Sequence, residues 1–248
     1  MLHSRFGRLS TALGNLRVMR FIQQQKTLLL CLVSFFALWS VRATFLYGID
    51  QSITVDFLRT IYSTLVKFAL WVGFAAIFVV VVKKKSLWSY LGLSDWLAAG
   101  SWTKCLVVGV SYFSLVVTYE IFVSGKSVIF PAQAVLSVSG ILFFMVSPFI
   151  EELLFRGLIL KEFLSTLSAL RENLLCSLLF VGIHLPFWLT HNNFDIILAS
   201  NCIAIFFFSL IAGWLYIKSW SIWPSVLIHI ANNILSSSLV MASSGSFT

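Results

Sequence analysis

The sequence predicts an all-α fold, a polytopic transmembrane helical bundle with about seven spans, and three observations support this prediction. Hydrophobic residues make up 59% of the 248 residues, and charged residues only 10%. Soluble domains carry about 25% charged and 45–50% apolar residues. The chain holds 24 Phe and 9 Trp, and long apolar runs recur along its whole length. A water-soluble core cannot hide this much apolar surface, so lipid must cover part of it.

The expected spans follow from the length of the apolar runs, because a transmembrane helix needs about 20 mostly apolar residues. Runs of this kind lie at 27–47, 60–82, 104–123, 132–155, 173–190, 198–217 and 222–242. The fourth run passes into an amphipathic stretch that ends near Thr166. We expect that helix either to project beyond the lipid or to break in two.

The basic residues predict the orientation, because cytoplasmic loops of membrane proteins are enriched in Lys and Arg. With the N-terminus in the cytoplasm, 13 of the 17 basic residues fall on the cytoplasmic side. The other four, at external segments or outward helix ends, are Arg42, Arg59, Lys67 and Lys126. We therefore predict an integral, multi-pass protein of a bacterial cell membrane with a cytoplasmic N-terminus.

The chain divides into four expected segments. Residues 1–26 form a basic cytoplasmic segment, 27–125 the N-terminal transmembrane helices, 126–242 a transmembrane core and 243–248 a tail. The net charge of +8 does not indicate a nucleic-acid partner, since the charges lie between the apolar runs. The predicted partner of these surfaces is the lipid bilayer. The four cysteines lie singly in apolar runs and form no CxxC pattern, which is typical of packing residues.

Two adjacent carboxylates and an arginine lie at the end of the fourth run. Ionisable groups inside the membrane cost at least about 2.5–3.5 kcal/mol each, so they are candidates for function. Glu152 and Arg156 are four residues apart on one helix face and can form an ion pair. Glu151 is rotated by about 100° from Glu152 and can face a polar cavity. Pro148 lacks an N–H, so a kink is expected just before the carboxylates. The alternative is that the acidic pair only marks the helix end at the interface.

Two further clusters place histidines in apolar helices. His184 lies in the fifth run, and His229 and Asn233 lie one turn apart on one face of the last run. Each cluster alone also fits a packing or interhelical hydrogen-bonding role. Together, however, they offer Glu151 and the histidines for deprotonating a water, and His229 and Asn233 as donors to an oxyanion. Glu and His can also bind zinc and its water, although HExxH is absent.

The three motifs resemble those of the CPBP family, which comprises type II CAAX prenyl proteases and bacteriocin-processing (Abi) proteins. The motifs are EExxxR (Glu151, Glu152, Arg156), FxxxH (Phe180, His184) and HxxxN (His229, Asn233), in family order on separate apolar helices. The resemblance covers roughly residues 130–240, and all three motifs are intact. It implies that 126–242 is a catalytic transmembrane core.

The resemblance also implies roles for single residues. Glu151 and His184 would activate the attacking water, and His229 and Asn233 would stabilise the oxyanion. Glu152 and Arg156 would support them. The family has been described both as metal-dependent and as glutamate-dependent without a metal. No cofactor is therefore assured, and a zinc ion, if present, would take Glu151, His184 and His229 as ligands.

The predicted function is that of an intramembrane endopeptidase, a hydrolase that cleaves a peptide bond near the cytoplasmic membrane face. Its substrate would be a peptide or protein at the membrane, and whether that substrate is prenylated or carries a leader is open. One alternative is a non-catalytic membrane scaffold or a bacteriocin-immunity-type protein that keeps its polar residues for packing. A second is a transporter with a proton relay. It would require a matching polar set in the first half of the chain, and the first half has none.

Overall fold

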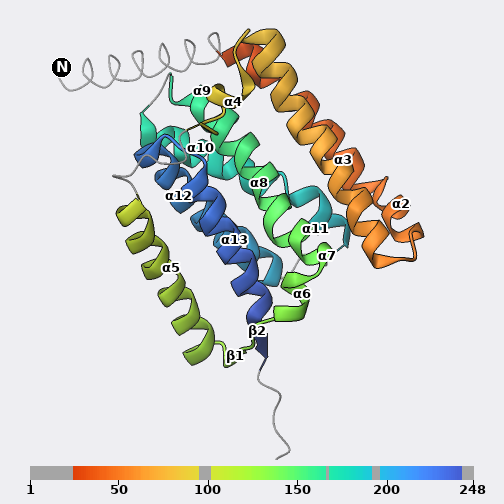
Figure 1. Cartoon of the computed structure of the whole chain (residues 1–248), viewed down its shortest axis with the longest axis vertical. Coiled ribbons are helices and arrows are strands. Elements are labelled where there is room, and N and C mark those ends of the chain that lie inside the picture. Colours follow the sequence, from red (N-terminus) through yellow and green to blue (C-terminus); the bar gives the residue numbers. More distant parts are fainter. Residues whose placement is uncertain (1–24, 95–101, 166–167, 192–195, 242–248) are drawn as a thin grey trace, which may run out of the picture.

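The computed structural model describes residues 25–94, 102–165, 168–191 and 196–241. Nearly all of the predicted basic segment 1–26 and the whole predicted tail 243–248 lie outside these residues. The described part is a bundle of helices with a pair of short strands at one end (Figure 1).

The helices follow the apolar runs of the sequence. Their bounds are α2 (Tyr47–Ser52), α3 (Asp56–Ile77), α4 (Leu87–Tyr90), α5 (Trp102–Phe122), α6 (Ala132–Leu136), α7 (Val138–Ile141), α8 (Ser147–Glu152), α9 (Lys161–Phe163), α10 (Ala169–Gly182), α11 (Leu185–His191), α12 (Ile196–Ser219) and α13 (Trp223–Ser238). Residues 25–44 form a further helix before α2. Three π-helical segments continue their neighbours, η1 (Phe78–Val82), η3 (Leu142–Val146) and η4 (Leu153–Leu160).

Six helical stretches of the described residues are long and apolar enough to cross a membrane. They are Gln25–Ser52, Asp56–Val82, Cys105–Phe122, Val138–Phe163, Ala169–His191 and Leu198–Ser219. Each overlaps one of the first six predicted runs, and the all-α bundle is confirmed. The seventh run corresponds to α13, which has only 16 residues. At 1.5 Å per residue α13 is about 24 Å long, shorter than a typical hydrocarbon core.

The fourth span begins later than the apolar run predicts, because the chain breaks at Ser137. The backbone of Ser137 is extended, and its hydroxyl accepts a hydrogen bond from the N–H of Gly140 at 2.9 Å. A Cβ on Gly140 would lie 1.8 Å from the carbonyl oxygen of Ala134, so only glycine fits against the end of α6. Beyond this break the helix runs from Val138 to Phe163. The helix therefore continues past residue 155 without a break up to Phe163, and whether it projects beyond the lipid stays a prediction.

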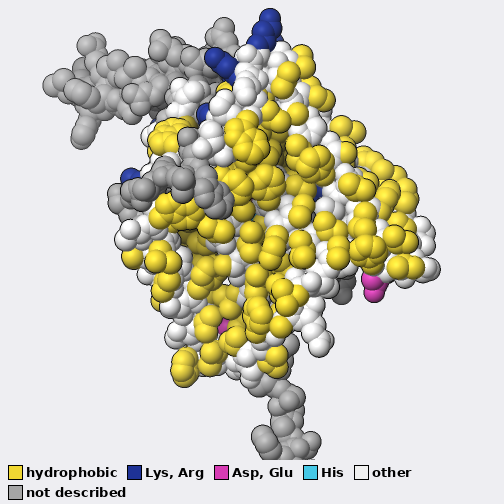
Figure 2. Space-filling view, in the orientation of Figure 1, with side chains coloured by type: hydrophobic (Ala, Val, Ile, Leu, Met, Phe, Trp, Pro, Cys, Tyr) yellow, Lys and Arg dark blue, Asp and Glu magenta, His cyan; other side chains and the backbone are white. Residues whose placement is uncertain are grey.

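This long helix occupies the centre of the bundle. All eight residues of η4 are buried, and α8 and η4 pack against α3, α10, α12 and α13. The outer faces of the surrounding helices carry large exposed apolar side chains, such as Phe45 and Phe122, which are more than 80% exposed. Figure 2 shows apolar side chains spread over most of the visible face. This distribution suits a bundle surrounded by lipid.

The two strands were not expected from the sequence. β1 (Lys126–Val128) follows α5, and β2 (Leu239–Met241) follows α13. They pair antiparallel, with Ser127 opposite Val240. Just beyond the pair, the N–H of Ile129 donates to the carbonyl oxygen of Ser238, the last residue of α13, at 2.7 Å. The pairing ties α5 to α13 at one end of the bundle. Runs of three residues are too short to show a period in the sequence.

Candidate active site

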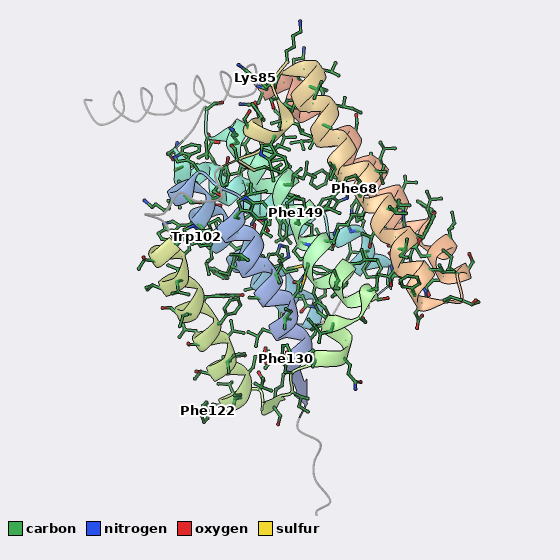
Figure 3. The ribbon with its side chains drawn as sticks, viewed as in Figure 1. Phe68, Lys85, Trp102, Phe122, Phe130 and Phe149 are labelled. Atoms are coloured by element: carbon green, nitrogen blue, oxygen red, sulfur yellow. The ribbon has the colours of Figure 1, made fainter. Side chains whose placement is uncertain are left out.

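The two adjacent carboxylates lie on α8, a single regular stretch between the π-helical segments η3 and η4. Pro148 lies in the first turn of α8. Its missing N–H would interrupt the helix ladder, and the wider π-helical turn of η3 ends immediately before it. Such π segments often occur at functional sites. The structure thus shows a change of helix type just before the carboxylates, and the kink expected there stays a prediction. Figure 3 shows this segment, marked by Phe149, near the middle of the bundle.

Glu152 and Arg156 form the ion pair that their spacing predicts. Arg156 Nη1 donates to Glu152 Oε1 at 2.9 Å, and both residues are fully buried. Arg156 Nη2 also donates to the hydroxyl and the carbonyl oxygen of Ser209 on α12, at 2.8 and 2.9 Å. The pair therefore joins the carboxylate helix to α12. Because the charges are buried and paired, removal of one partner would leave the other uncompensated.

His229 lies between the two carboxylates. Its Nδ1 is 2.7 Å from Glu152 Oε1, and its Nε2 is 3.7 Å from Glu151 Oε2. An ionised carboxylate can only accept, so Nδ1 carries the proton in this contact. Glu152 thus fixes the orientation of the ring and leaves Nε2 toward Glu151. Helical spacing predicts only the pairing of Glu152 with Arg156. In the structure, Oε1 of Glu152 accepts hydrogen bonds from both Arg156 and His229.

His184 lies at the junction of α10 and α11. Its Nδ1 is 2.7 Å from the carbonyl oxygen of Phe180, so the proton is on Nδ1 and a neutral ring keeps Nε2 as an acceptor. The Phe180 ring lies 5.1 Å from the ring of His184 and 5.9 Å from that of His229, measured between centroids. Phe180 therefore packs against both histidines.

A cavity of about 470 Å³ brings the predicted catalytic residues together. Glu151, His184, His229 and Asn233 all line it. Aromatic rings form much of the rest of its wall, including Trp39, Trp71, Phe143, Phe187, Trp188 and Phe208. Cavities of 300–1,000 Å³ with apolar walls and a few converging polar groups are typical of ligand sites. Residues far apart in the sequence thus meet at one place, as expected.

Lys67 is a member of the site that the sequence patterns did not reveal. From α3 its Nζ contacts the carboxylate of Glu151 and the hydroxyl of Ser147, and it lies 4.9 Å from the Trp71 ring centroid. Charge counting assigns Lys67 to an outward helix end. Its position inside an apolar run is the signal that could have found it, by the same rule that singles out Glu151.

The cavity lies in a defined half of the bundle. Its wall includes Trp39 and His229 from the middle of their helices, Asp50 from the end of the first span, Ser63 from the start of the second, and Asn233 from the later part of α13. This is the half opposite Lys83, Lys84 and Lys85, which follow the end of η1. A cytoplasmic N-terminus and a site near the cytoplasmic face were both predicted from the sequence. The two predictions do not fit together in this structure, because the N-terminal end of the first span and the cavity lie in opposite halves.

Two other intramembrane charges have partners of their own. Arg42 Nη2 contacts both carboxylate oxygens of Asp50, at 2.6 and 2.7 Å. Glu120 lies 2.8 Å from Lys126 Nζ. Arg42 and Asp50 also form part of the cavity wall.

The arrangement of Glu151, His184 and His229 does not fit a metal centre. Among the described residues no group of three or more His, Cys, Asp and Glu side chains has the spacing of metal ligands. Lys67 contacts the Glu151 carboxylate, where its positive charge would oppose a cation, and Nδ1 of His229 is taken by Glu152. We therefore derive no step through zinc.

Comparison with known proteins agrees with these observations. Residues 133–235 match the model of the family described as Rce1-like, "Type II CAAX prenyl endopeptidase Rce1-like". Neither the curated proteins nor the solved structures yield a match. The matched segment contains α8, His184, His229 and Asn233, the residues around which the cavity is built. The chain is thus an integral, multi-pass membrane protein, and its residues 133–235 are similar to the Rce1-like family of type II CAAX prenyl endopeptidases, a family of membrane proteases.

Proposed function

We propose that the protein is an intramembrane endopeptidase that hydrolyses a peptide bond in the cavity with water activated by Glu151 and His184. The observation that carries this proposal is the shared cavity, in which two candidate bases face two candidate hydrogen-bond donors. No serine, threonine or cysteine nucleophile is needed for this chemistry. Water attacks the carbonyl carbon directly once a base removes its proton.

Glu151 is the proposed base, and His184 its partner. Glu151 takes a proton from the water as the water oxygen bonds to the carbonyl carbon, and the carbonyl becomes an oxyanion. The proton then passes to the leaving amine as the C–N bond breaks. His184 supports this step, since its Nε2 can accept a hydrogen bond from the same water while Nδ1 is held by the Phe180 carbonyl.

His229 and Asn233 are the proposed oxyanion donors. The side-chain amide of Asn233 can donate a hydrogen bond whatever the protonation state of its neighbours. His229 donates through Nε2 only when the ring carries both protons, because Nδ1 already donates to Glu152. Removal of one oxyanion donor costs about 10²–10³ in kcat in enzymes that have been measured. In this proposal Glu152 and Arg156 act indirectly, by holding His229 in place.

The proposed substrate is a peptide or protein at the membrane, with a prenylated and a leader-bearing substrate as the two forms to be compared. The aromatic walls of the cavity suit an apolar segment beside the cleaved bond, and its polar groups suit the peptide backbone. A scaffold or immunity protein would not need four polar groups to converge on an open cavity.

The test is a comparison of peptide termini in membranes that contain the wild-type protein, Glu151→Gln or His184→Ala. We expect specific termini in the wild-type membranes and their loss in both variants, with rates reduced about 10²–10⁴-fold, as is usual for a general base. Glu120→Gln is the matched control, because Glu120 pairs with Lys126 away from Glu151. Cleavage by Glu151→Gln at the wild-type rate would exclude the proposed base.

A further inference from the structure

A second cavity continues the catalytic cavity toward one end of the bundle. It has a volume of about 360 Å³ and shares Trp39, Lys67 and Ser147 with the first, among other residues. It reaches Gln51 and Thr60, which lie beside the α2–α3 connection. Most residues that it adds to the shared wall are polar: Gln51, Arg59, Thr60 and Thr64. Glu151 is therefore connected to this end of the bundle by a passage whose wall combines aromatic side chains with these polar ones.

The opposite end is closed by the helical segment that follows the carboxylates. All eight residues of η4, which follows Glu152 directly, are buried. Beyond η4, Glu162 forms an ion pair with Lys83 at 2.5 Å, contacts the Tyr90 hydroxyl and accepts at its carbonyl from Gln25 Nε2 at 2.9 Å. Water and peptide would thus meet a buried, packed segment on this side and the passage on the other.

The charges of the described residues differ between the two ends. The closed end carries Lys26, Lys83, Lys84, Lys85, Lys161, Arg171 and Lys218 against Glu162 and Glu172. At the open end each cation has its own carboxylate: Arg42 with Asp50, Arg59 with Asp56, and Lys126 with Glu120. In Figure 2 dark blue side chains mark the upper, closed end and magenta ones appear lower. An excess of Lys and Arg identifies the cytoplasmic side of a membrane protein.

We infer that the active site is reached from the non-cytoplasmic side of the membrane, through the passage between the first span, α3 and η3. This inference rests on the proposed function for its substrate, which is then a membrane-anchored peptide whose cleaved bond lies in the outer half of the bilayer or just beyond it. A bond on the cytoplasmic side would have to cross the packed η4 segment to reach Glu151.

Sided cysteine labelling tests this inference without a substrate. Single cysteines are introduced as Gln51→Cys at the mouth, Ser63→Cys inside the passage and Ser86→Cys beside the lysines, after Cys31, Cys105, Cys176 and Cys202 have been replaced by serine or alanine. A membrane-impermeant maleimide is then applied to intact cells and to inverted membrane vesicles. Ser86 is exposed and serves as the matched control for the closed end.

We expect Gln51→Cys and Ser63→Cys to react in intact cells and to lose this reactivity in sealed inverted vesicles, and Ser86→Cys to show the reverse. Reaction of Gln51→Cys only in inverted vesicles would overturn the inference. So would a Ser63→Cys that stays unlabelled from both sides, because the passage would then be closed. The labelling pattern should be the same in a Glu151→Gln background. A labelling result that overturns the inferred access route can therefore be told apart from a loss of the proposed hydrolysis.

Discussion

Lys67 brings a positive charge from α3 to the carboxylate that we propose as the base. Its ammonium group contacts Glu151 and Ser147, and it lies over the Trp71 ring. The contact fixes one oxygen of Glu151, while the other lies 3.7 Å from His229. Lys67 therefore determines where the proposed base points, and its positive charge remains beside Glu151 after that carboxylate has taken a proton.

Substitution of Lys67 should reduce turnover more than substrate binding. For Lys67→Met we expect kcat to fall roughly 10²-fold, the scale expected when a catalytic group is misplaced by about 1 Å, with little change in KM. Lys67→Arg should recover part of the loss because it restores the cation. Steady-state kinetics on a peptide found by the terminus comparison would measure both values. Lys126→Met is the control, and an equal loss of kcat in that variant would contradict a local role for Lys67.

The residues that the sequence could and could not predict differ in how their contacts arise. The pairing of Glu152 with Arg156 follows from helical spacing alone, and the motif order indicated His184, His229 and Asn233. The contacts of Glu151 with Lys67 and of Glu152 with His229 join separate helices. No local period encodes which helices become neighbours, so these contacts required the structure.

At the scale of elements, the close packing of α10 against α12 depends on Gly213. A Cβ at this position would lie 1.9 Å from Oδ1 of Asn173, whose Nδ2 donates to the Leu210 carbonyl at 2.8 Å. The two helices carry different parts of the site, because α10 leads to His184 and α12 holds Arg156 through Ser209. A substitution at this contact is therefore expected to displace both His184 and Arg156.

Gly213→Ala should destabilise the bundle by about 1–3 kcal/mol, the usual cost of overpacking. Gly109→Ala in α5 is the matched control, since no heavy atom lies within 4 Å of its added Cβ. There the better helix propensity of alanine should leave stability equal or slightly higher. Thermal unfolding in detergent would compare the two. An unfolding midpoint for Gly213→Ala at or above that of Gly109→Ala would show that Asn173 moves aside without cost.

The hydropathy of the sequence predicted where the transmembrane helices lie better than it predicted the residues at which they begin and end. Six of the seven apolar runs match spans, but the break at Ser137 and the 16-residue length of α13 were missed. Both depend on interactions that an apolar run does not encode. Ser137 is fixed by its hydrogen bond to Gly140, and α13 ends where β2 begins to pair with β1.

At the scale of the whole molecule, the lysines after η1 are expected to hold the orientation. Lys84 and Lys85 are exposed, and each basic residue near an anionic membrane surface contributes about 1 kcal/mol. Lys84→Gln with Lys85→Gln should therefore increase the fraction of inverted chains. Labelling of Gln51→Cys in intact cells would fall in proportion. Lys126→Gln, at the other end, should cause no such fall, and an unchanged pattern in the double variant would assign the orientation to other residues.

The buried η4 segment also shapes the electrical environment of the site. The voltage across a polarised membrane drops mainly where mobile ions and water are absent, and here that region is the packed half around η4. If water fills the passage that we infer, Glu151 shares the potential of the compartment at the open end. Moving one charge through 100 mV requires about 2.3 kcal/mol, and protons exchanged between Glu151 and that compartment avoid this work. Hydrolysis should run at the same speed in energised and de-energised membranes.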